Sequence, residues 1–481
     1  MGKLSNLEPK AVFHYFEEIS RIPRGSGNEK GISDYLVSFA KGLGLEVIQD
    51  EFLNIIIKKP GTKGHENAPG VIIQGHMDMV CEKNKGTEHD FLKDGLDLRI
   101  DGDNIFANGT TLGADNGIAV AYGMAILASN EIEHPPLELL LTVDEETGMT
   151  GAMNISKEHV DGKILLNLDS EEEGELLLSC AGGIRSKSVV KVATEASNEF
   201  KGLEVKVRGL KGGHSGMEIN KGRANSNKLM GRILKALMDE YEIRLSYIEG
   251  GSKNNAIPRE ADAIIGVKAG HVQDVKDMVV KLEGMFQNEF KVQDSGINLE
   301  VSDAKLDTVF TKEVSDRTID LLYMYPNGVN TMSKSMHGLT ESSMNIGVVH
   351  TENGEVVFDS SIRSSVASLK DELVLRTETI TNLLGGVFTT SASYPEWEYN
   401  SDSKIREICI EVYKKMTGEE PKLTAIHAGV ECGLFKERLG NLDMISFGPN
   451  LYDVHTPNEH MSISSVQNIW KYLLEVLKEI K

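Results

Sequence analysis

Apolar runs that end at a histidine, aspartate or glutamate are the feature of this sequence that most constrains its fold. VIIQGHMDMV (71–80), PLELLLTVDEE (136–146) and KILLNLDS (163–170) have the composition of buried strands, and GIAVAYGMAILAS (117–129) that of a buried helix. Alternating strands and helices with apolar strands are typical of an α/β domain with a largely parallel central sheet. Because such sheets bind ligands at the carboxyl ends of their strands, we expect these polar residues to share one site.

The pattern changes near residue 185. LEVKVRG (203–209) alternates as a strand does, NSNKLMGRILKALMDEY (225–241) is an amphipathic helix, and MNIGVVHTENGEVVFDSSIRSS (344–365) reads as a hairpin. This region is therefore predicted to be an α+β, ββα-rich domain. From about residue 400, two helices flank the short strand DMISFGPN (443–450). We predict a discontinuous catalytic domain formed by 1–184 and 399–481, with an inserted domain at 185–398.

The N-terminal segment 8–43 reads as two amphipathic helices separated by the turn-forming stretch IPRGSGNE (22–29). Ser26 or Asn28 is expected to cap the second helix.

Charge and cysteine content exclude several classes of protein. The chain of 481 residues has 73 acidic and 51 basic residues and a formal net charge of -22, which argues against nucleic-acid and membrane-surface binding. Its four cysteines are scattered and form no CxxC pair, so they indicate neither a zinc knuckle nor a disulfide framework. No apolar run is long enough to span a membrane. A cytoplasmic location is the expectation.

Five short motifs carry the candidate chemistry. They occur in the order GHMDMV (75–80), GADNG (113–117), VDEETG (143–148), NLDS (167–170) and VHTPNE (454–459). A pair of divalent ions about 3.5–4 Å apart needs a bridging carboxylate with histidine or carboxylate ligands on each side. The motifs supply that set: His76, Asp115, Glu146, Asp169 and His455.

Residues next to these ligands have expected roles of their own. Asp78 lies two residues after His76 and should share its strand face, where it can accept the second imidazole N–H and orient the ring. Glu145 and Glu146 are adjacent and should point differently, so that one binds metal and the other serves as general base. His427 and His460 compete with His455 for the last ligand position. We favour His455 because Pro457 places it in a tight turn.

The motifs together resemble the M20 metallopeptidase family. SRIPRGSGNE (20–29), GGHSGMEINKGRANSNK (212–228), NNAIPRE (254–260) and HAGVECGLF (427–435) are similar to its aminoacyl-histidine dipeptidase branch, the Xaa-His or carnosinase-like enzymes. The resemblance covers nearly the whole chain. It implies two metal ions, with zinc expected first and manganese or cobalt as alternatives.

The resemblance also implies roles for the ligands. Asp115 would bridge the ions, His76 and Asp169 would hold one, Glu146 and His455 the other, and Glu145 would be the general base. Many family members have Asp-Asp where this chain has Asp115-Asn116, and Asn116 is not expected to bind metal.

Four residues near or within the inserted domain are candidates for substrate binding. His214 lies in the glycine-rich GGHSG loop and, by the resemblance, would stabilise the carbonyl oxyanion. Arg363 follows the strand-like EVVFDSSI and is suited to bind a substrate carboxylate with both arms of its guanidinium. Asn254 and Gly429 are weaker candidates. His214 acts either in its own chain or on a partner's site.

The sequence therefore predicts a zinc-dependent dipeptidase that cleaves unblocked dipeptides, Xaa-His among them, through a metal-bridging hydroxide. The inserted domain would act as a lid and in dimerisation, and a homodimer is an alternative to a monomer. Rival functions are an aminoacylase or tripeptidase on the same scaffold, and a catalytically silent metal-binding scaffold. No GxxxxGK[ST] and no strand-linked GxGxxG appears, so a nucleotide-binding enzyme is disfavoured.

Overall fold

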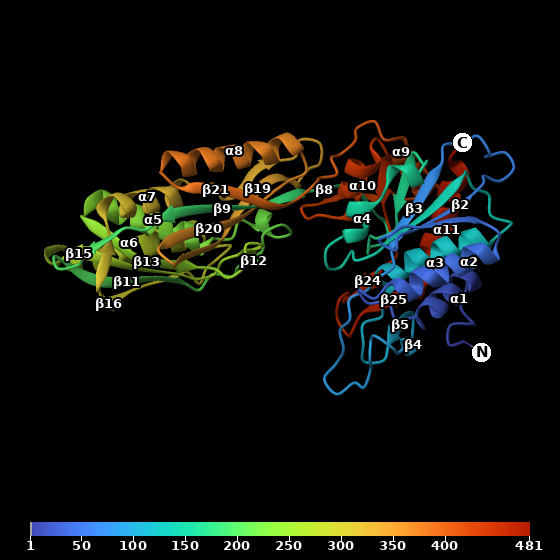
Figure 1. The fold of residues 1–481 in the computed structure, drawn as a ribbon, viewed down its shortest axis with the longest axis horizontal. Coiled ribbons are helices and arrows are strands. Elements are labelled where there is room, and N and C mark those ends of the chain that lie inside the picture. The colour runs from blue at the N-terminus through green and yellow to red at the C-terminus, as the bar shows by residue number, and fades with distance from the viewer. Residues whose placement is uncertain (1) are drawn as a thin grey trace. The chain divides into compact units, whose positions relative to one another are not determined.

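The computed structural model describes residues 2–481, which form two compact units (Figure 1). Unit 1 contains the chain up to Ser179 together with Tyr399–Ala425 and Val430–Lys481. Unit 2 contains Cys180–Glu398 and Ile426–Gly429. Each unit encloses a hydrophobic core of its own, as independently packed domains do.

Unit 1 is built on an eight-stranded mixed sheet in the order β1-β2-β6-β3-β7-β23-β8-β22. Its middle strands β6, β3, β7 and β23 are parallel, whereas β1 and β2 pair antiparallel at one side and β8 pairs antiparallel with β23. The parallel strands are buried along their length, which explains their continuous apolar sequences. The strands are β1 Glu46–Gln49, β2 Ile55–Lys59, β3 Val71–His76, β6 Leu137–Thr142, β7 Ile164–Asn167, β8 Glu175–Cys180, β22 Lys422–Ile426 and β23 Asp443–Ser446.

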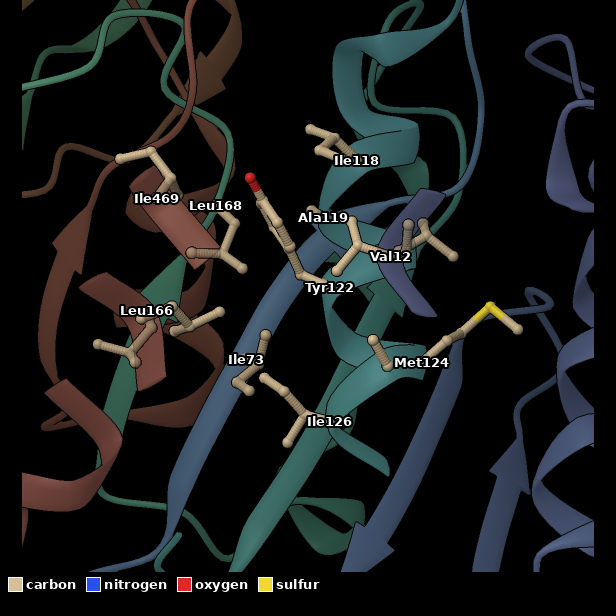
Figure 2. Close-up of a cluster of buried hydrophobic side chains, with 14 of the residues drawn as sticks. Val12, Ile73, Ile118, Ala119, Tyr122, Met124, Ile126, Leu166, Leu168 and Ile469 are labelled. Carbon is tan, nitrogen blue, oxygen red and sulfur yellow. The ribbon is translucent and has the colours of Figure 1, made fainter. Parts of the chain in front are cut away.

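The core of unit 1 is centred on helix α3, which is buried on nearly every side. Figure 2 shows Ala119, Tyr122 and Ile126 of α3 beside Ile73 of β3 and Leu166 of β7. Full burial of an isoleucine or leucine side chain contributes about 1.5–3 kcal/mol to the stability of the fold. This packing therefore stabilises the strands whose ends precede the candidate site. The helices are α1 Lys10–Ile19, α2 Lys30–Gly42, α3 Ala114–Ala128, α4 Thr150–Asn154, α9 Lys404–Thr417, α10 Glu431–Leu439 and α11 Ile463–Glu479, with the 3₁₀ turn η1 Lys157–His159.

A second, small sheet in unit 1 joins distant parts of the chain. Its order is β24-β25-β5-β4, all antiparallel, with β4 Leu98–Asp101, β5 Asn104–Ala107, β24 Leu451–Tyr452 and β25 His460–Ser462. The β24–β25 connection contains the VHTPNE motif, so this sheet anchors the C-terminal motif within the same unit as the first four.

Unit 2 is an α+β unit around one antiparallel sheet in the order β16-β11-β15-β13-β19-β20-β9-β21, with β18 paired to β19. Two short antiparallel pairs, β10–β17 and β12–β14, flank it. The strands are β9 Gly182–Lys191, β10 Thr194–Ala196, β11 Phe200–Arg208, β12 Gly213–His214, β13 Ile243–Gly250, β14 Ala256–Ile257, β15 Ala261–Lys268, β16 Asn298–Ala304, β17 Thr308–Phe310, β18 Gly328–Met332, β19 Thr340–Glu352, β20 Glu355–Ser364 and β21 Val387–Tyr394. The helices are α5 Ser226–Glu240, α6 Val272–Glu289, α7 Lys312–Met324 and α8 Ala367–Leu383, with the turns η2 Ile219–Lys221 and η3 Ala269–His271.

Three local predictions are wrong. Neither Ser26 nor Asn28 caps α2, whose N-cap is Glu29, because the Ser26 hydroxyl instead donates to Asp78 at 2.8 Å. Asp78 does not lie on the strand of His76, because β3 ends at His76 itself. Arg363 does not follow a strand but lies within β20, paired with Ser343 and Gly183.

No helix among residues 2–481 is both long enough and apolar enough to cross a membrane.

Candidate functional site

The parallel strands of unit 1 deliver polar residues at their carboxyl ends. β3 ends at His76, Glu145 and Glu146 come shortly after β6, and Asp169 lies just beyond β7. Because β6, β3 and β7 are neighbours in the sheet, these ends lie side by side. The sheet topology therefore gathers three of the five motifs at one edge.

Two further segments bring the remaining motifs to this edge. Asp115 stands at the start of α3, where it and Asn116 depart from helical φ and ψ. His455 lies in the turn between β24 and β25 and has a left-handed backbone with φ of 62°. Left-handed conformations are uncommon for residues other than glycine and are found most often at turns and functional sites.

The Asp115 carboxylate lies between two imidazoles. Its Oδ1 is 3.1 Å from Nε2 of His76 and its Oδ2 is 3.1 Å from Nε2 of His455. His76 Nε2 also lies 3.5 Å from Asp169 Oδ1, and His455 Nε2 lies 3.0 Å from Glu146 Oε2. The five predicted ligands thus form a continuous series in the order Asp169, His76, Asp115, His455 and Glu146.

Asp78 holds both the histidine and the acidic pair. Its Oδ1 lies 3.2 Å from Nδ1 of His76, the ring nitrogen that faces away from Asp115. The same carboxylate accepts the backbone N–H groups of Glu145 at 3.1 Å and Glu146 at 3.3 Å. Asp78 is fully buried, so these contacts are shielded from water. The side chain orients His76 from beyond the strand end rather than from the strand face.

Asn116 links the first and fourth motifs. Its side-chain oxygen accepts the backbone N–H of His76 at 3.2 Å, and its amide nitrogen donates to the carbonyl of Leu168 at 2.8 Å. An asparagine can make both bonds at once because its amide has an acceptor and a donor. Asn116 therefore places His76 and the segment before Asp169 relative to each other.

Electrostatics at this site favour cations. Burial raises the pKa of Glu145 to about 9 and that of Asp169 to about 6. Hydrogen bonds to Asp115 and Glu146 raise the pKa of His455 to about 11. Burial opposes a charge on His76, but Asp169 and Asp115 outweigh it and hold the pKa of His76 well above its ordinary value. The cluster thus retains protons that divalent ions would displace.

The donor set fits a pair of divalent ions. His76, Asp115 and Glu146 each offer a ligand atom within 4.8 Å of the other two. In the described part of the chain, Oε1 of Glu146 and Oδ1 of Asp169 are buried without a hydrogen-bond donor. Buried carboxylate oxygens without donors are unfavourable unless a cation neutralises them, and mixed imidazole and carboxylate sets suit zinc, manganese or cobalt.

A buried polar layer that the sequence analysis did not single out lies beside this cluster. Glu431, in HAGVECGLF, accepts from Gln74 of β3 at 2.7 Å and from Thr142 of β6 at 2.9 Å. Burial raises its pKa to about 7, and the charge of Asp169 contributes. Glu431 is the first residue of α10, and no local periodicity linked it to these two strands.

The remaining histidine candidates lie elsewhere. His460 is stacked on the rings of Phe106 and Tyr452, and its Nδ1 contacts the carbonyl of Asn458. His427 belongs to unit 2, where its Nε2 contacts the Ser343 hydroxyl at 2.7 Å. Of the three histidines considered for the last ligand position, His455 is therefore the one that contacts Asp115.

Unit 2 contains a separate cluster around His214, on β12. The His214 Nδ1 accepts backbone N–H groups from Gly216 at 3.3 Å and Met217 at 3.0 Å. A neutral imidazole that accepts at Nδ1 carries its proton on Nε2. Burial, and next the charge of Arg363, lower the pKa of His214, which favours this neutral form. His214 therefore presents an Nε2–H donor.

Arg363 is a buried cation in this cluster. It is 8% exposed and its Nη1 donates to the Tyr394 hydroxyl at 2.7 Å. Its Nε is buried without an acceptor, and no carboxylate among residues 2–481 forms an ion pair with it. Such a guanidinium is suited to bind an anion supplied by a ligand.

Small residues allow this cluster to converge. A Cβ built on Gly216 would lie 3.1 Å from the His214 ring, 3.3 Å from Arg363 Nε and 2.4 Å from the His427 carbonyl. A Cβ on Gly429 would lie 2.6 Å from the Tyr394 ring, so Gly429 supports the tyrosine that holds Arg363. These close approaches explain glycine at both positions.

Asn254 is bound through its backbone. Its carbonyl accepts from the Asn345 side chain at 2.9 Å, and it packs against Gly347. It lies just before β14, whose Ala256 pairs with His214. The structure thus places Asn254 near the His214 loop, held there through its backbone.

Residues 72–479 match the sequence profile of peptidase family M20/M25/M40, and the chain belongs to this family. The cytosol non-specific dipeptidase of Escherichia coli (strain K12) is 40% identical over 482 residues, covering 100% of this chain and 99% of that protein. The crystal structure of aminoacylhistidine dipeptidase from Vibrio alginolyticus is 40% identical, with a TM-score of 0.97 over 99% of this chain and 98% of that one.

A more distant structure shares the fold alone. The aminopeptidase PepT from Bacillus cereus is 14% identical, with a TM-score of 0.59 over 98% of this chain and 99% of that one. The family resemblance seen in the sequence motifs is confirmed by the profile match over residues 72–479 and by the full-length relative at 40% identity.

Proposed function

We propose that this protein is a dipeptidase that hydrolyses unblocked dipeptides and depends on two divalent metal ions, with zinc expected first. The observation that carries the proposal is the Asp115 carboxylate, whose two oxygens each contact a different histidine. This arrangement suits a bridging ligand, with His76 and Asp169 on one side and His455 and Glu146 on the other. The full-length similarity to two dipeptidases supports the reaction class.

The chain's own residues divide the chemistry among them. Bound divalent ions would supply Lewis acidity and make a water molecule more acidic. Glu145 has a high proton affinity because it is buried beside other carboxylates, and it is suited to take a proton from that water and pass it to the leaving amine. Of the two adjacent glutamates, Glu146 contacts His455 and would be the one that binds metal. Asp78 fixes both glutamates through their backbone N–H groups.

The cluster of unit 2 offers the groups that a peptide needs. The Nε2–H of His214 is suited to donate to the carbonyl oxygen as negative charge develops on it. Arg363 is suited to bind the free carboxylate of a dipeptide, and this charge requirement would favour short, unblocked substrates. That unit 2 serves as a lid, and that it mediates a dimer, stay predictions.

A substrate panel tests the proposal. Metal-free protein is reconstituted with zinc, manganese or cobalt and assayed on free dipeptides including Xaa-His, on tripeptides and on N-acetyl amino acids. We expect turnover of free dipeptides. Preference for N-acetyl amino acids or tripeptides would indicate the aminoacylase or tripeptidase alternative, and metal binding without turnover would indicate a silent scaffold. A cytoplasmic location stays a prediction, in keeping with the name of the Escherichia coli relative.

A further inference from the structure

Arg24 is a buried arginine in the loop between α1 and α2, and it contacts two ligand-bearing segments at once. It is 2% exposed. Its Nη1 donates to the carbonyls of Met77 at 3.0 Å and Asp78 at 3.1 Å, directly after His76. Its Nη2 donates to the carbonyl of Gly113, in the loop that precedes Asp115. One planar guanidinium thus joins the first and second motifs.

Glu459 holds the same loop through its N–H groups. This carboxylate is 2% exposed, and it closes the VHTPNE motif. Its oxygens accept the backbone N–H groups of Leu112 at 2.8 Å, Gly113 at 3.0 Å, Ala114 at 2.8 Å and Asp115 at 3.4 Å. Because the first N–H groups of a helix have no intrahelical partner, Glu459 satisfies donors at the start of α3 that would otherwise be left buried and unbonded.

The backbone at Asp115 needs this external support. Asp115 and Asn116 have non-helical φ and ψ, so the regular hydrogen bonds of α3 do not determine where the Asp115 carboxylate points. Arg24 donates to a carbonyl of the loop, and Glu459 accepts hydrogen bonds from the N–H groups of the same loop. Burying the charges of Arg24 and Glu459 carries a desolvation cost, so we place their main consequence in the backbone that they position.

We propose that Arg24 and Glu459 are positioning residues that hold Asp115 and His76 at the separation needed to bind metal. The inference rests on the proposed metal centre and adds to it two residues that touch neither metal ligand atoms nor substrate. Lysine at position 24 would keep the positive charge but should not replace arginine. The two terminal nitrogens of one rigid guanidinium donate to three carbonyls, which a single ammonium group does not reproduce.

The glycines of GADNG are explained by the same guanidinium. A Cβ on Gly113 would lie 2.6 Å from Nη2 of Arg24, and a Cβ on Gly117 would lie 2.5 Å from it. Gly117 lies inside α3, where alanine would ordinarily be the better helix former. Gly117→Ala is therefore a variant that displaces the guanidinium while keeping every charge.

The test is a competition titration of metal-free protein with Zn²⁺ against a chromophoric chelator. Variants are Arg24→Met, Arg24→Lys and Gly117→Ala. Arg406 provides the matched control, because it is a buried arginine of unit 1 that donates to the carbonyls of Asn400 at 2.6 Å and Ser401 at 2.7 Å, away from the five motifs.

We expect Arg24→Met to weaken Zn²⁺ binding by about 10–100-fold, the range seen when outer-shell partners of metal ligands are removed. Arg24→Lys and Gly117→Ala should weaken it in the same direction, and Arg406→Met should leave it unchanged even where it lowers the melting temperature. At saturating Zn²⁺ the Arg24 variants should recover most of the wild-type kcat.

Wild-type affinity in all three test variants would overturn the inference while leaving the metal centre in place. If Arg24→Met does not fold, Arg24→Lys and Gly117→Ala decide the question by the same titration. A wild-type protein that binds no Zn²⁺ would overturn the proposed metal centre and this inference together.

Discussion

Replacing Arg363 with methionine should selectively impair substrates that carry a free C-terminal carboxylate. Methionine keeps much of the volume of the side chain but removes its charge and all of its donors. Arg363 is buried within β20, and among residues 2–481 its guanidinium donates to one acceptor, the neutral Tyr394 hydroxyl. Because no carboxylate of the described chain pairs with it, the lost interaction is one with the ligand.

The expected magnitude follows from the bonds that a buried guanidinium makes to a carboxylate. Each hydrogen bond to a charged group contributes about 1.5–3 kcal/mol, and removing one partner of a buried charge pair costs about 2–5 kcal/mol or more. At about 1.4 kcal/mol per decade, kcat/KM on a free dipeptide should fall by roughly 10²–10³-fold. An amidated dipeptide offers Arg363 a single neutral acceptor, and a hydrogen bond to it is worth about 1 kcal/mol. The kcat/KM of Arg363→Met on this substrate should therefore fall by about tenfold or less.

The assay compares kcat/KM for one dipeptide and its C-terminal amide in wild type and Arg363→Met. Arg185→Met is the matched control, since Arg185 lies on the neighbouring strand β9 but is already paired with Asp359 and its side chain is 49% exposed. The control should leave both substrates unaffected. Equal losses on the free and amidated dipeptides in Arg363→Met would refute the carboxylate role and leave Arg363 as a structural residue.

Four further predictions concern other residues of the two clusters. Asp115→Ala should lose both metal ions together, measured by metal analysis, and two ions retained would contradict the bridging assignment. Glu145→Gln should keep its metal and lose about 10²–10⁴-fold in kcat, whereas Glu146→Gln should lower metal content; the reverse pattern would exchange their roles. His214→Ala should lower kcat at unchanged metal content, and a change confined to KM would argue against an oxyanion donor. Burial, and then the charge of Arg363, lower the pKa of His427 to about 3 from its ordinary 6.5. Between these two pH values the unfolded state therefore binds more protons than the folded state, so acidification should destabilise the wild-type protein. In urea unfolding, this loss should exceed that of His427→Asn by up to about 1.4 kcal/mol per pH unit.

Much of the fold could be predicted because its signals are local. The buried run 117–129 corresponds to α3, which ends at Ala128, and the hairpin at 344–365 corresponds to β19 and β20, joined by a turn at Asn353 and Gly354. Helix α6 was not predicted, although its buried Val275, Val279, Leu282 and Phe286 recur at helical spacing. The outer strands of the unit 1 sheet are antiparallel, which depends on how distant segments pair and has no local signal.

The candidate ligands could be predicted for a related reason. His76, Glu146 and Asp169 end or follow apolar runs, so they were expected at a common sheet edge, where the structure places them. Asp78 and Arg363 were assigned to the wrong place relative to their strands, because strand ends depend on pairing partners as well as on composition. The cap expected at Ser26 failed because a distant carboxylate, Asp78, competes for its hydroxyl.

The amino-acid sequence by itself determined the order of the motifs, the chemical type of each candidate ligand and the family. Only the tertiary structure decided that His455 rather than His427 or His460 meets Asp115, and that Arg24 and Glu459 hold the loop between them. The physical reason is the range of the interactions. Periodicity and turn chemistry act over a few residues, whereas these contacts join segments 340 and 345 residues apart, as between His455 and Asp115 and between Glu459 and Ala114. Such contacts exist only once the sheet has brought the distant segments together.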